Sequence, residues 1–302
     1  MAMSSSWRGV SNSWLILLKK VLGGHAKRAS YKIGGYTVIE VMIVLAVTGV
    51  LFSSAVLMFQ GQQGKTSISQ SLYDLASKIE TYSTEVNSGV YPDSQNFTCS
   101  VDGSGHPVLS GGSGGTGTNQ SCLFLGRALQ IVPNSSSLYA YSVLGDRTIH
   151  SGGADTNQTV TSFDQASPTP AQDNGGGWLL YDTYNLPSNE TFSMSKVTDI
   201  NNTTFNNYDL IGLYIDLDTA TASSSTNSLS IRGYNFPNGG ANAALSASVK
   251  NCIQQNAPCG TSSYSLVRSW VLCVQDGTST GMVTVTTTPS GVSTAVDAQE
   301  CK

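Results

Sequence analysis

The chain has 302 residues, of which 39% are hydrophobic and only 11% are charged. This length allows one large or two ordinary domains with a buried core, and the apolar content excludes a fully disordered chain. The formal net charge of −4 is unevenly distributed, because residues 1–35 hold six bases and no acid while the remainder holds nine bases and 19 acids. Neutralising phosphates requires clustered lysine and arginine, so this acidic body excludes a general nucleic-acid binder.

Residues 1–35 form a basic leader, whose bases are Arg8, Lys19, Lys20, Lys27, Arg28 and Lys32. Residues 36–59 follow as an apolar run that contains a single charge, Glu40. Roughly 20 apolar residues suffice for a helix to cross the hydrocarbon core of a bilayer, so this run predicts a transmembrane helix. The positive-inside rule then leaves the N-terminus in the cytoplasm and the acidic body outside. A cleavable secretory signal is the alternative, but no small-residue cleavage pattern follows residue 59.

Glu40 places a carboxylate in the first turns of the predicted membrane helix. An ionised group there costs about 2.5–3.5 kcal/mol on insertion scales, which makes Glu40 a candidate functional residue. The alternative is a carboxylate that merely reaches the membrane interface at the start of the helix.

The order of these features resembles the N-terminus of type IV prepilins. The matching residues are Gly35, Tyr36, Thr37 and Glu40, preceded by the basic leader and followed by the apolar run to residue 59. The resemblance implies that a prepilin peptidase cuts between Gly35 and Tyr36 and that the new Tyr36 amine is N-methylated. It also implies that Glu40 pairs with the Tyr36 ammonium of a neighbouring subunit, and that Gly49 is a helix-weakening glycine used in assembly. The implied partners are copies of this chain or related pilins in a helical filament, the peptidase and a membrane assembly machinery.

Beyond the membrane run, residues 60–91 predict an amphipathic continuation of the same helix. Its apolar stripe recurs at spacings of four and three residues and comprises Ile68, Leu72, Leu75, Ile79, Tyr82 and Val86. The charged residues Asp74, Lys78, Glu80 and Glu85 fall off the stripe, as expected of a solvated face. Gly89 and Pro92 predict the end of the helix.

Residues 92–302 predict a globular head outside the cell. Short β-like runs cover residues 138–144, 178–184, 210–217, 228–234, 266–275 and 282–288. Residues 122–132 and 241–254 are weaker helix candidates, and the Gly- and Ser-rich stretches 102–121 and 151–177 predict long loops. The expected fold class is α+β, with a long N-terminal helix packed on an antiparallel sheet. This arrangement also resembles the pilin fold.

The six cysteines all lie beyond the membrane run, at positions 99, 122, 252, 259, 273 and 301. An even number outside the membrane indicates disulfides in an oxidising compartment, whereas the C-x-x-C pairs that zinc favours are missing. Fifteen connectivities are possible for six cysteines. The preferred one joins sequence neighbours, as Cys99–Cys122, Cys252–Cys259 and Cys273–Cys301.

Other motifs give no catalytic, cofactor or metal site. The G-x-S-x-G pattern at residues 111–115 lies in a low-complexity loop, without the strand and helix that a hydrolase requires. His25, His106 and His150 have no metal-ligand spacing and are expected in solvated segments. Asp216 and Asp218 lack the glycine and final glutamate of a calcium-binding loop.

The sequence therefore predicts a structural subunit of an extracellular type IV pilus-like filament, with roles in surface attachment or motility. Before assembly it would be a single-pass membrane protein, and afterwards part of a surface filament. The alternatives are a pseudopilin of a secretion or DNA-uptake machine and, less favoured, a membrane-anchored extracellular enzyme. The enzyme would need a convergent catalytic set, which the sequence does not display.

Overall fold

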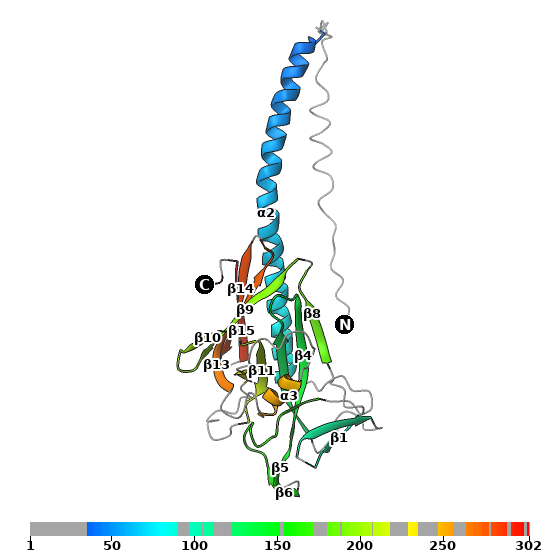
Figure 1. Cartoon of the computed structure of the whole chain (residues 1–302), viewed down its shortest axis with the longest axis vertical. Coiled ribbons are helices and arrows are strands. Elements are labelled where there is room, and N and C mark those ends of the chain that lie inside the picture. Colours follow the sequence, from blue (N-terminus) through cyan, green and yellow to red (C-terminus); the bar gives the residue numbers. More distant parts are fainter. Residues whose placement is uncertain are drawn as a thin grey trace, which may run out of the picture. The chain divides into compact units, whose positions relative to one another are not determined.

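The computed structural model describes residues 35–89, 97–103, 105–111, 122–151, 154–171, 180–187, 189–206, 208–217, 229–234, 247–255, 264–277, 279–288, 291–298 and 301. The chain divides into two compact units, Met1–Leu57 and Met58–Lys302. The first unit contains the apolar start of a long helix, and the second contains a large antiparallel sheet (Figure 1). Strand is the predominant secondary structure of the described residues, so the α+β prediction captures the long helix and the sheet but underestimates the strand content.

The helices are α2, Val38–Asn87, and α3, Ala247–Ile253. The strands are β1 Phe97–Val101, β2 Pro107–Gly111, β3 Cys122–Ile131, β4 Ser137–Asp146, β5 Thr148–Ser151, β6 Ala154–Thr159, β7 Thr169–Pro170, β8 Leu180–Asn185, β9 Thr191–Asp199, β10 Thr204–Asn206, β11 Leu210–Ile215, β12 Leu229–Tyr234, β13 Tyr264–Gln275, β14 Thr280–Thr288 and β15 Gly291–Asp297.

The main sheet runs in the order β10-β9-β13-β12-β11-β3-β4-β7, and every described pairing in it is antiparallel. Two strands have more than two neighbours. Strand β13 pairs with β9 along one edge and with β12 and then β14 along the other, with a register shift between Val267 and Ser269. Strand β4 likewise pairs with both β8 and β7, in addition to β3. The sheet therefore branches at β13 and β4, and β1–β2 and β5–β6 form separate hairpins.

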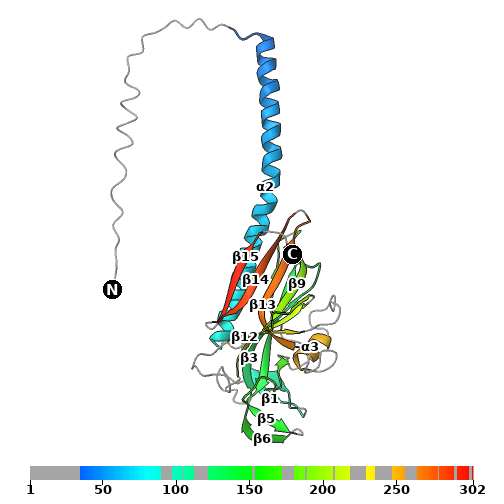
Figure 2. The same ribbon diagram turned by 90° about the vertical axis from the view of Figure 1, so that its left-hand side faces the viewer.

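Both faces of the central strands are buried. In β11, Ile211 and Leu213 belong to an apolar cluster shared with α2, whereas Leu210 and Tyr214 belong to a second cluster on the other face. The second face is covered by α3 and by residues 160–171, which contribute Phe163 among others. Figure 2 shows α3 and the part of α2 within the head on opposite sides of the sheet.

The C-terminal half of α2 packs on the sheet through the predicted stripe. All six stripe residues are at most 1% exposed, which confirms the prediction. The helix ends at Asn87, and the N–H of Gly89 donates to the carbonyl of Val86 at 3.0 Å. Gly89 has a φ of 65°, a left-handed conformation that glycine adopts without a steric penalty. The predicted stop at Gly89 is therefore confirmed, and Pro92 lies outside the described residues.

The prediction of a helix over residues 122–132 is wrong, because Cys122–Ile131 is strand β3. Nearly every residue of β3 is buried, so its sequence lacks the alternation of apolar and polar residues that marks a half-exposed strand. The helix predicted over residues 241–254 is present only as α3, and residues 241–246 lie outside the described part. The six predicted strands each coincide with an observed strand, namely β4, β8, β11, β12, β13 and β14.

The two stretches predicted as long loops also contain strands. Strand β2 lies within residues 102–121, while part of β5 and all of β6 and β7 lie within residues 151–177. Phe163 and Ala166, between β6 and β7, are buried and pack over the sheet, so this segment covers the core instead of forming a flexible insertion. Strands β1, β9, β10 and β15 were not predicted either.

Candidate processing and assembly site

Gly35 and Tyr36 lie just ahead of the first helical residue, Val38. Both are exposed, and the side chain of Tyr36 is 80% exposed. Among the described residues, apart from its chain neighbour, no atom lies within 4 Å of the position where a Cβ on Gly35 would stand. The peptide bond predicted to be cleaved therefore lies outside regular secondary structure, just before α2.

Thr37 caps the start of α2. Its Oγ1 accepts a hydrogen bond from the N–H of Glu40 at 3.4 Å, and its carbonyl accepts from the same N–H at 3.0 Å. Threonine at the cap with glutamate three residues later has the spacing of a capping box. This cap was not predicted, although Thr-x-x-Glu before an apolar run is visible in the sequence. Glu40 therefore also has a local role, because its negative charge lies at the positive end of the helix dipole.

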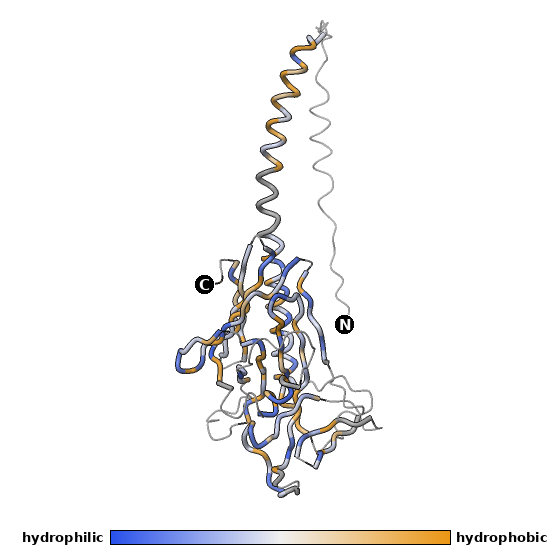
Figure 3. The backbone as a smooth tube through the Cα atoms, viewed as in Figure 1, coloured by the Kyte–Doolittle hydropathy of each residue, from blue (hydrophilic) through white to orange (hydrophobic). Residues whose placement is uncertain are grey.

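The segment Val38–Val56 of α2 is long and apolar enough to cross a membrane, and none of it is buried inside the chain. Figure 3 shows the predominance of apolar residues along this part of the helix. Its hydroxyl groups are satisfied within the helix, because Thr48 Oγ1 donates to the Val44 carbonyl and Ser53 Oγ donates to the Gly49 carbonyl, both at 2.8 Å. Neither of these two hydroxyls therefore requires water or another partner in an apolar environment.

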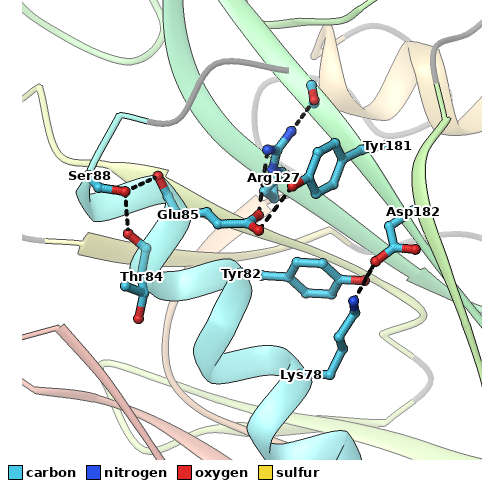
Figure 4. A network of polar contacts seen from close by, with 9 residues as sticks. Lys78, Tyr82, Thr84, Glu85, Ser88, Arg127, Tyr181 and Asp182 are labelled. Atoms are coloured by element: carbon cyan, nitrogen blue, oxygen red, sulfur yellow. Dashed lines mark hydrogen bonds and ion pairs between the residues drawn. The ribbon is translucent and has the colours of Figure 1, made fainter. Parts of the chain in front are cut away.

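A second polar arrangement lies between α2 and the sheet, and we term it the helix–sheet network (Figure 4). It consists of Lys78, Tyr82 and Glu85 from α2, Arg127 from β3, and Tyr181 and Asp182 from β8. The prediction that Lys78 and Glu85 lie on a solvated face is wrong. Both are only partly exposed, and both contact residues of the sheet.

Asp182 receives two donors from α2. Lys78 Nζ lies 2.6 Å from Asp182 Oδ2, and the Tyr82 hydroxyl donates to the same oxygen at 3.1 Å. Burial favours a raised pKa for Asp182, but the hydrogen bonds from Lys78 and Tyr82 outweigh it and hold that pKa below its ordinary value. Burial, together with the nearby Asp182 charge, raises the pKa of Tyr82, so its hydroxyl remains a donor.

Arg127 is fully buried and meets Glu85 from α2. Its Nη2 lies 3.5 Å from Glu85 Oε2, its Nη1 donates to the Ser142 hydroxyl, and its guanidinium carbon lies 3.3 Å from the centroid of the Tyr181 ring. The Tyr181 hydroxyl donates to Glu85 Oε1 at 2.9 Å. Burial holds the pKa of the Arg127 guanidinium below its ordinary value, and the nearby Tyr181 and Glu85 only partly oppose this effect. A buried arginine is tolerated here because a carboxylate and an aromatic face surround it.

Two of the three predicted disulfides are present, Cys99–Cys122 and Cys273–Cys301, with Cα–Cα distances of 5.8 and 6.0 Å. The first joins β1 to the start of β3, and the second ties Cys301 to β13. Cys252 of α3 is also disulfide-bonded, and its expected partner Cys259 lies outside the described residues.

Within the described ranges, no group of three or more His, Cys, Asp or Glu side chains is placed to hold a metal ion. His106 Nδ1 lies 3.3 Å from Thr169 Oγ1. His150 is part of β5 instead of a loop. Asp216 follows β11, and His25, Asp218 and residues 112–121 lie outside the described residues.

Comparison of the chain with family models, curated proteins and solved structures finds no match.

Proposed function

We propose that this chain is a structural subunit of a type IV pilus-like filament and polymerises through its apolar N-terminal helix after removal of its leader. One observation carries the proposal. Gly35 and Tyr36 lie exposed ahead of α2, Glu40 lies in its first turn, and the apolar segment Val38–Val56 begins at the same point. The proposed roles of the filament are surface attachment or motility.

The exposed apolar segment needs a cover, and the proposal supplies one before assembly and another after it. Apolar surface left in water is unfavourable by about 25 cal/mol per Å². Side chains such as Phe52 and Val50 are 72% and 71% exposed within the chain, so other molecules must cover them. In the proposal a bilayer does so before assembly, with the N-terminus in the cytoplasm, and the same segments of neighbouring copies do so in the extracellular filament.

Glu40 would supply the specificity of that packing. A lone carboxylate among apolar helices is heavily penalised by desolvation. Cleavage after Gly35 would create an ammonium on Tyr36, and this group of a neighbouring subunit can offset the charge of Glu40 and set the axial register. An uncleaved chain lacks that ammonium and retains the basic leader, so it would not assemble.

The first test is processing. Gly35→Glu places a bulky charged side chain beside the proposed cleavage point, so the full-length chain should accumulate in the membrane, as measured by mass spectrometry of the N-terminus. Gly103→Glu is the matched control, because no atom of the described residues, apart from the chain neighbours, lies within 4 Å of a Cβ at Gly103 either, and its N-terminus should be Tyr36. A Gly35→Glu chain that begins at Tyr36 would refute the proposal.

The second test is the location of the polymer. Immunogold labelling of the head on intact cells should decorate long surface filaments. Labelling confined to the periplasm would instead assign the chain to the pseudopilins of a secretion or DNA-uptake machine.

A further inference from the structure

The apolar stripe of α2 repeats in such a way that a shift of the helix by seven residues keeps most, though not all, of its packing against the sheet. Its spacing alternates between four and three residues, so a shift of seven residues places Ile68 where Leu75 lies and Leu72 where Ile79 lies. Such a shift moves the helix by about 10.5 Å along its axis and turns its buried face by only about 20°. Four of the six stripe positions therefore receive another stripe residue after such a shift, and the two at one end receive residues from outside the stripe.

The charges of the helix–sheet network repeat with the same period but with opposite signs. Lys78 and Glu85 are seven residues apart, and each contacts a group of opposite charge, Asp182 and Arg127 respectively. A shift of one heptad in one direction brings Glu85 to the level of Asp182. A shift in the other direction brings Lys78 to the level of Arg127. Either shift places like charges together in a partly or fully buried site, where their repulsion is strongest.

We propose that the helix–sheet network is a register device, in which Lys78 and Glu85 specify the position of α2 on the sheet while the apolar stripe supplies the attraction. Tyr82 adds to it, because its hydroxyl reaches Asp182 only in the native position. A shift would place Leu75 or an unrelated residue there. The inference concerns residues of the head alone and does not depend on the proposed filament.

The position of the helix can be read from a single competition between cysteines. A Cβ on Gly281 of β14 would lie 2.4 Å from Leu72 Cδ1, so positions 72 and 281 are in contact in the native register. After a shift of seven residues, position 79 replaces position 72. The full chain carrying Leu72→Cys, Ile79→Cys and Gly281→Cys is oxidised mildly in detergent, and peptide mapping under non-reducing conditions gives the ratio of the 72–281 to the 79–281 cross-link.

With the native network, the 72–281 cross-link should dominate. The charge exchange Lys78→Glu with Glu85→Lys, made in the same background, places like charges together in the native register and opposite charges together in the shifted one. It should raise the share of the 79–281 cross-link roughly tenfold or more.

If the charge exchange prevents folding, a neutral variant tests whether the charges set the register of α2. It combines Lys78→Met, Glu85→Gln, Arg127→Met and Asp182→Asn, which removes all four charges without leaving one buried and unpaired. Native Cys99–Cys122 and Cys273–Cys301 peptides in the same map report that the head has folded. The neutral variant should form both cross-links. If it forms the 72–281 cross-link as selectively as the native network does, then packing alone sets the register and the proposal is overturned.

Discussion

Four exposed asparagines of the head, Asn134, Asn157, Asn189 and Asn202, adopt positive φ values between 57° and 78°. Asparagine is the residue other than glycine that most readily adopts this left-handed conformation. Each of the four also begins an Asn-x-Ser/Thr sequence, which on its face indicates a glycosylation acceptor. The left-handed backbone conformation accounts for these asparagines without any modification, at three turns or bends and, for Asn157, within β6.

Asp209, which precedes β11, is a buried residue that is only 4% exposed. Burial raises its pKa from 3.8 to about 6. The folded chain therefore binds the proton more tightly than the unfolded chain, and this contribution to stability is lost as the pH rises from about 4 through 6. Asp209→Asn should stabilise the protein by about 2–3 kcal/mol at pH 7, since each pKa unit corresponds to about 1.4 kcal/mol.

Urea denaturation of the Asp209→Asn variant and the parent chain in detergent measures this difference. At pH 3.5 both chains carry a neutral side chain at this position, so their stabilities should converge there. Equal stability at pH 7 would show that Asp209 is solvated in the folded protein.

Gly281 illustrates a glycine required by close approach. A Cβ there would lie 2.4 Å from Leu72 Cδ1 and 3.2 Å from Ile68 Cγ2, both on the buried face of α2. Gly281→Ala should therefore destabilise the head by about 1–3 kcal/mol, the usual effect of overpacking. Gly103→Ala adds the same methyl group in open space and should change the stability by less than about 0.5 kcal/mol. Thermal denaturation of the two variants side by side provides the comparison, and equal melting temperatures would contradict this account.

Among the secondary-structure elements, the ones with a single buried face are the easiest to predict from the sequence. The stripe of α2 is visible because only one side of the helix is buried, which produces the 3.6-residue period. Strand β3 is hidden because α2 covers one of its faces and α3 with residues 160–171 covers the other. Strand β15 is hidden for a different reason, since Gly291–Asp297 contains small and polar residues that resemble a loop.

The candidate site divides in the same way. The residues proposed for processing and for the assembly charge lie within the short segment from Gly35 to Glu40, so a local pattern is enough to single them out. The helix–sheet network joins Glu85 to Arg127 and Lys78 to Asp182, residues that are far apart in the sequence. Only the pairing of β8 with β4 and of β4 with β3 brings these residues to one face, and no local pattern encodes that topology.

The disulfide Cys273–Cys301 holds the end of the chain against β13, and its cysteines are separated by 28 positions. Closing a loop of this size stabilises a protein by about 3.5 kcal/mol in the chain-entropy model. The pair of substitutions Cys273→Ser and Cys301→Ser should lower the free energy of unfolding by about that amount, as measured by urea denaturation without reductant. The equivalent removal of Cys99–Cys122, with a separation of 23, should have a similar effect. An unchanged midpoint in either case would mean that the unfolded chain is not constrained by that bond.

At the scale of the whole molecule, the proposed polymer would depend on the charge of Glu40, which also lies in the first turn of α2. Glutamine satisfies the capping box as glutamate does, so Glu40→Gln removes the charge while preserving the start of α2. In the proposed filament this leaves the Tyr36 ammonium uncompensated at each interface, a penalty of about 3–5 kcal/mol, and surface filaments should be nearly abolished. Cleavage and membrane insertion should persist.

Thr37→Val is the complementary variant. It removes the side-chain cap, at a cost of about 1 kcal/mol, but retains the Glu40 charge, so filaments should still form. Filament counts by electron microscopy and cleaved subunit in the membrane fraction are measured for both variants. Normal filaments from the Glu40→Gln chain, with normal cleavage, would show that the charge of Glu40 has no role in assembly and that Glu40 acts only at the start of the helix.

The match in period between the apolar stripe and the charges of Lys78 and Glu85 has a mechanical consequence. A pull along α2 loads its interface with the sheet in shear, and apolar contacts alone would yield gradually because each lost contact is replaced by a similar one. The ion pairs instead oppose the first displacement with a threshold force, and a displacement of one heptad, about 10.5 Å, would bring like charges together. We therefore expect the head to be stiff under tension up to the force that breaks the two ion pairs, and then to yield in a single event.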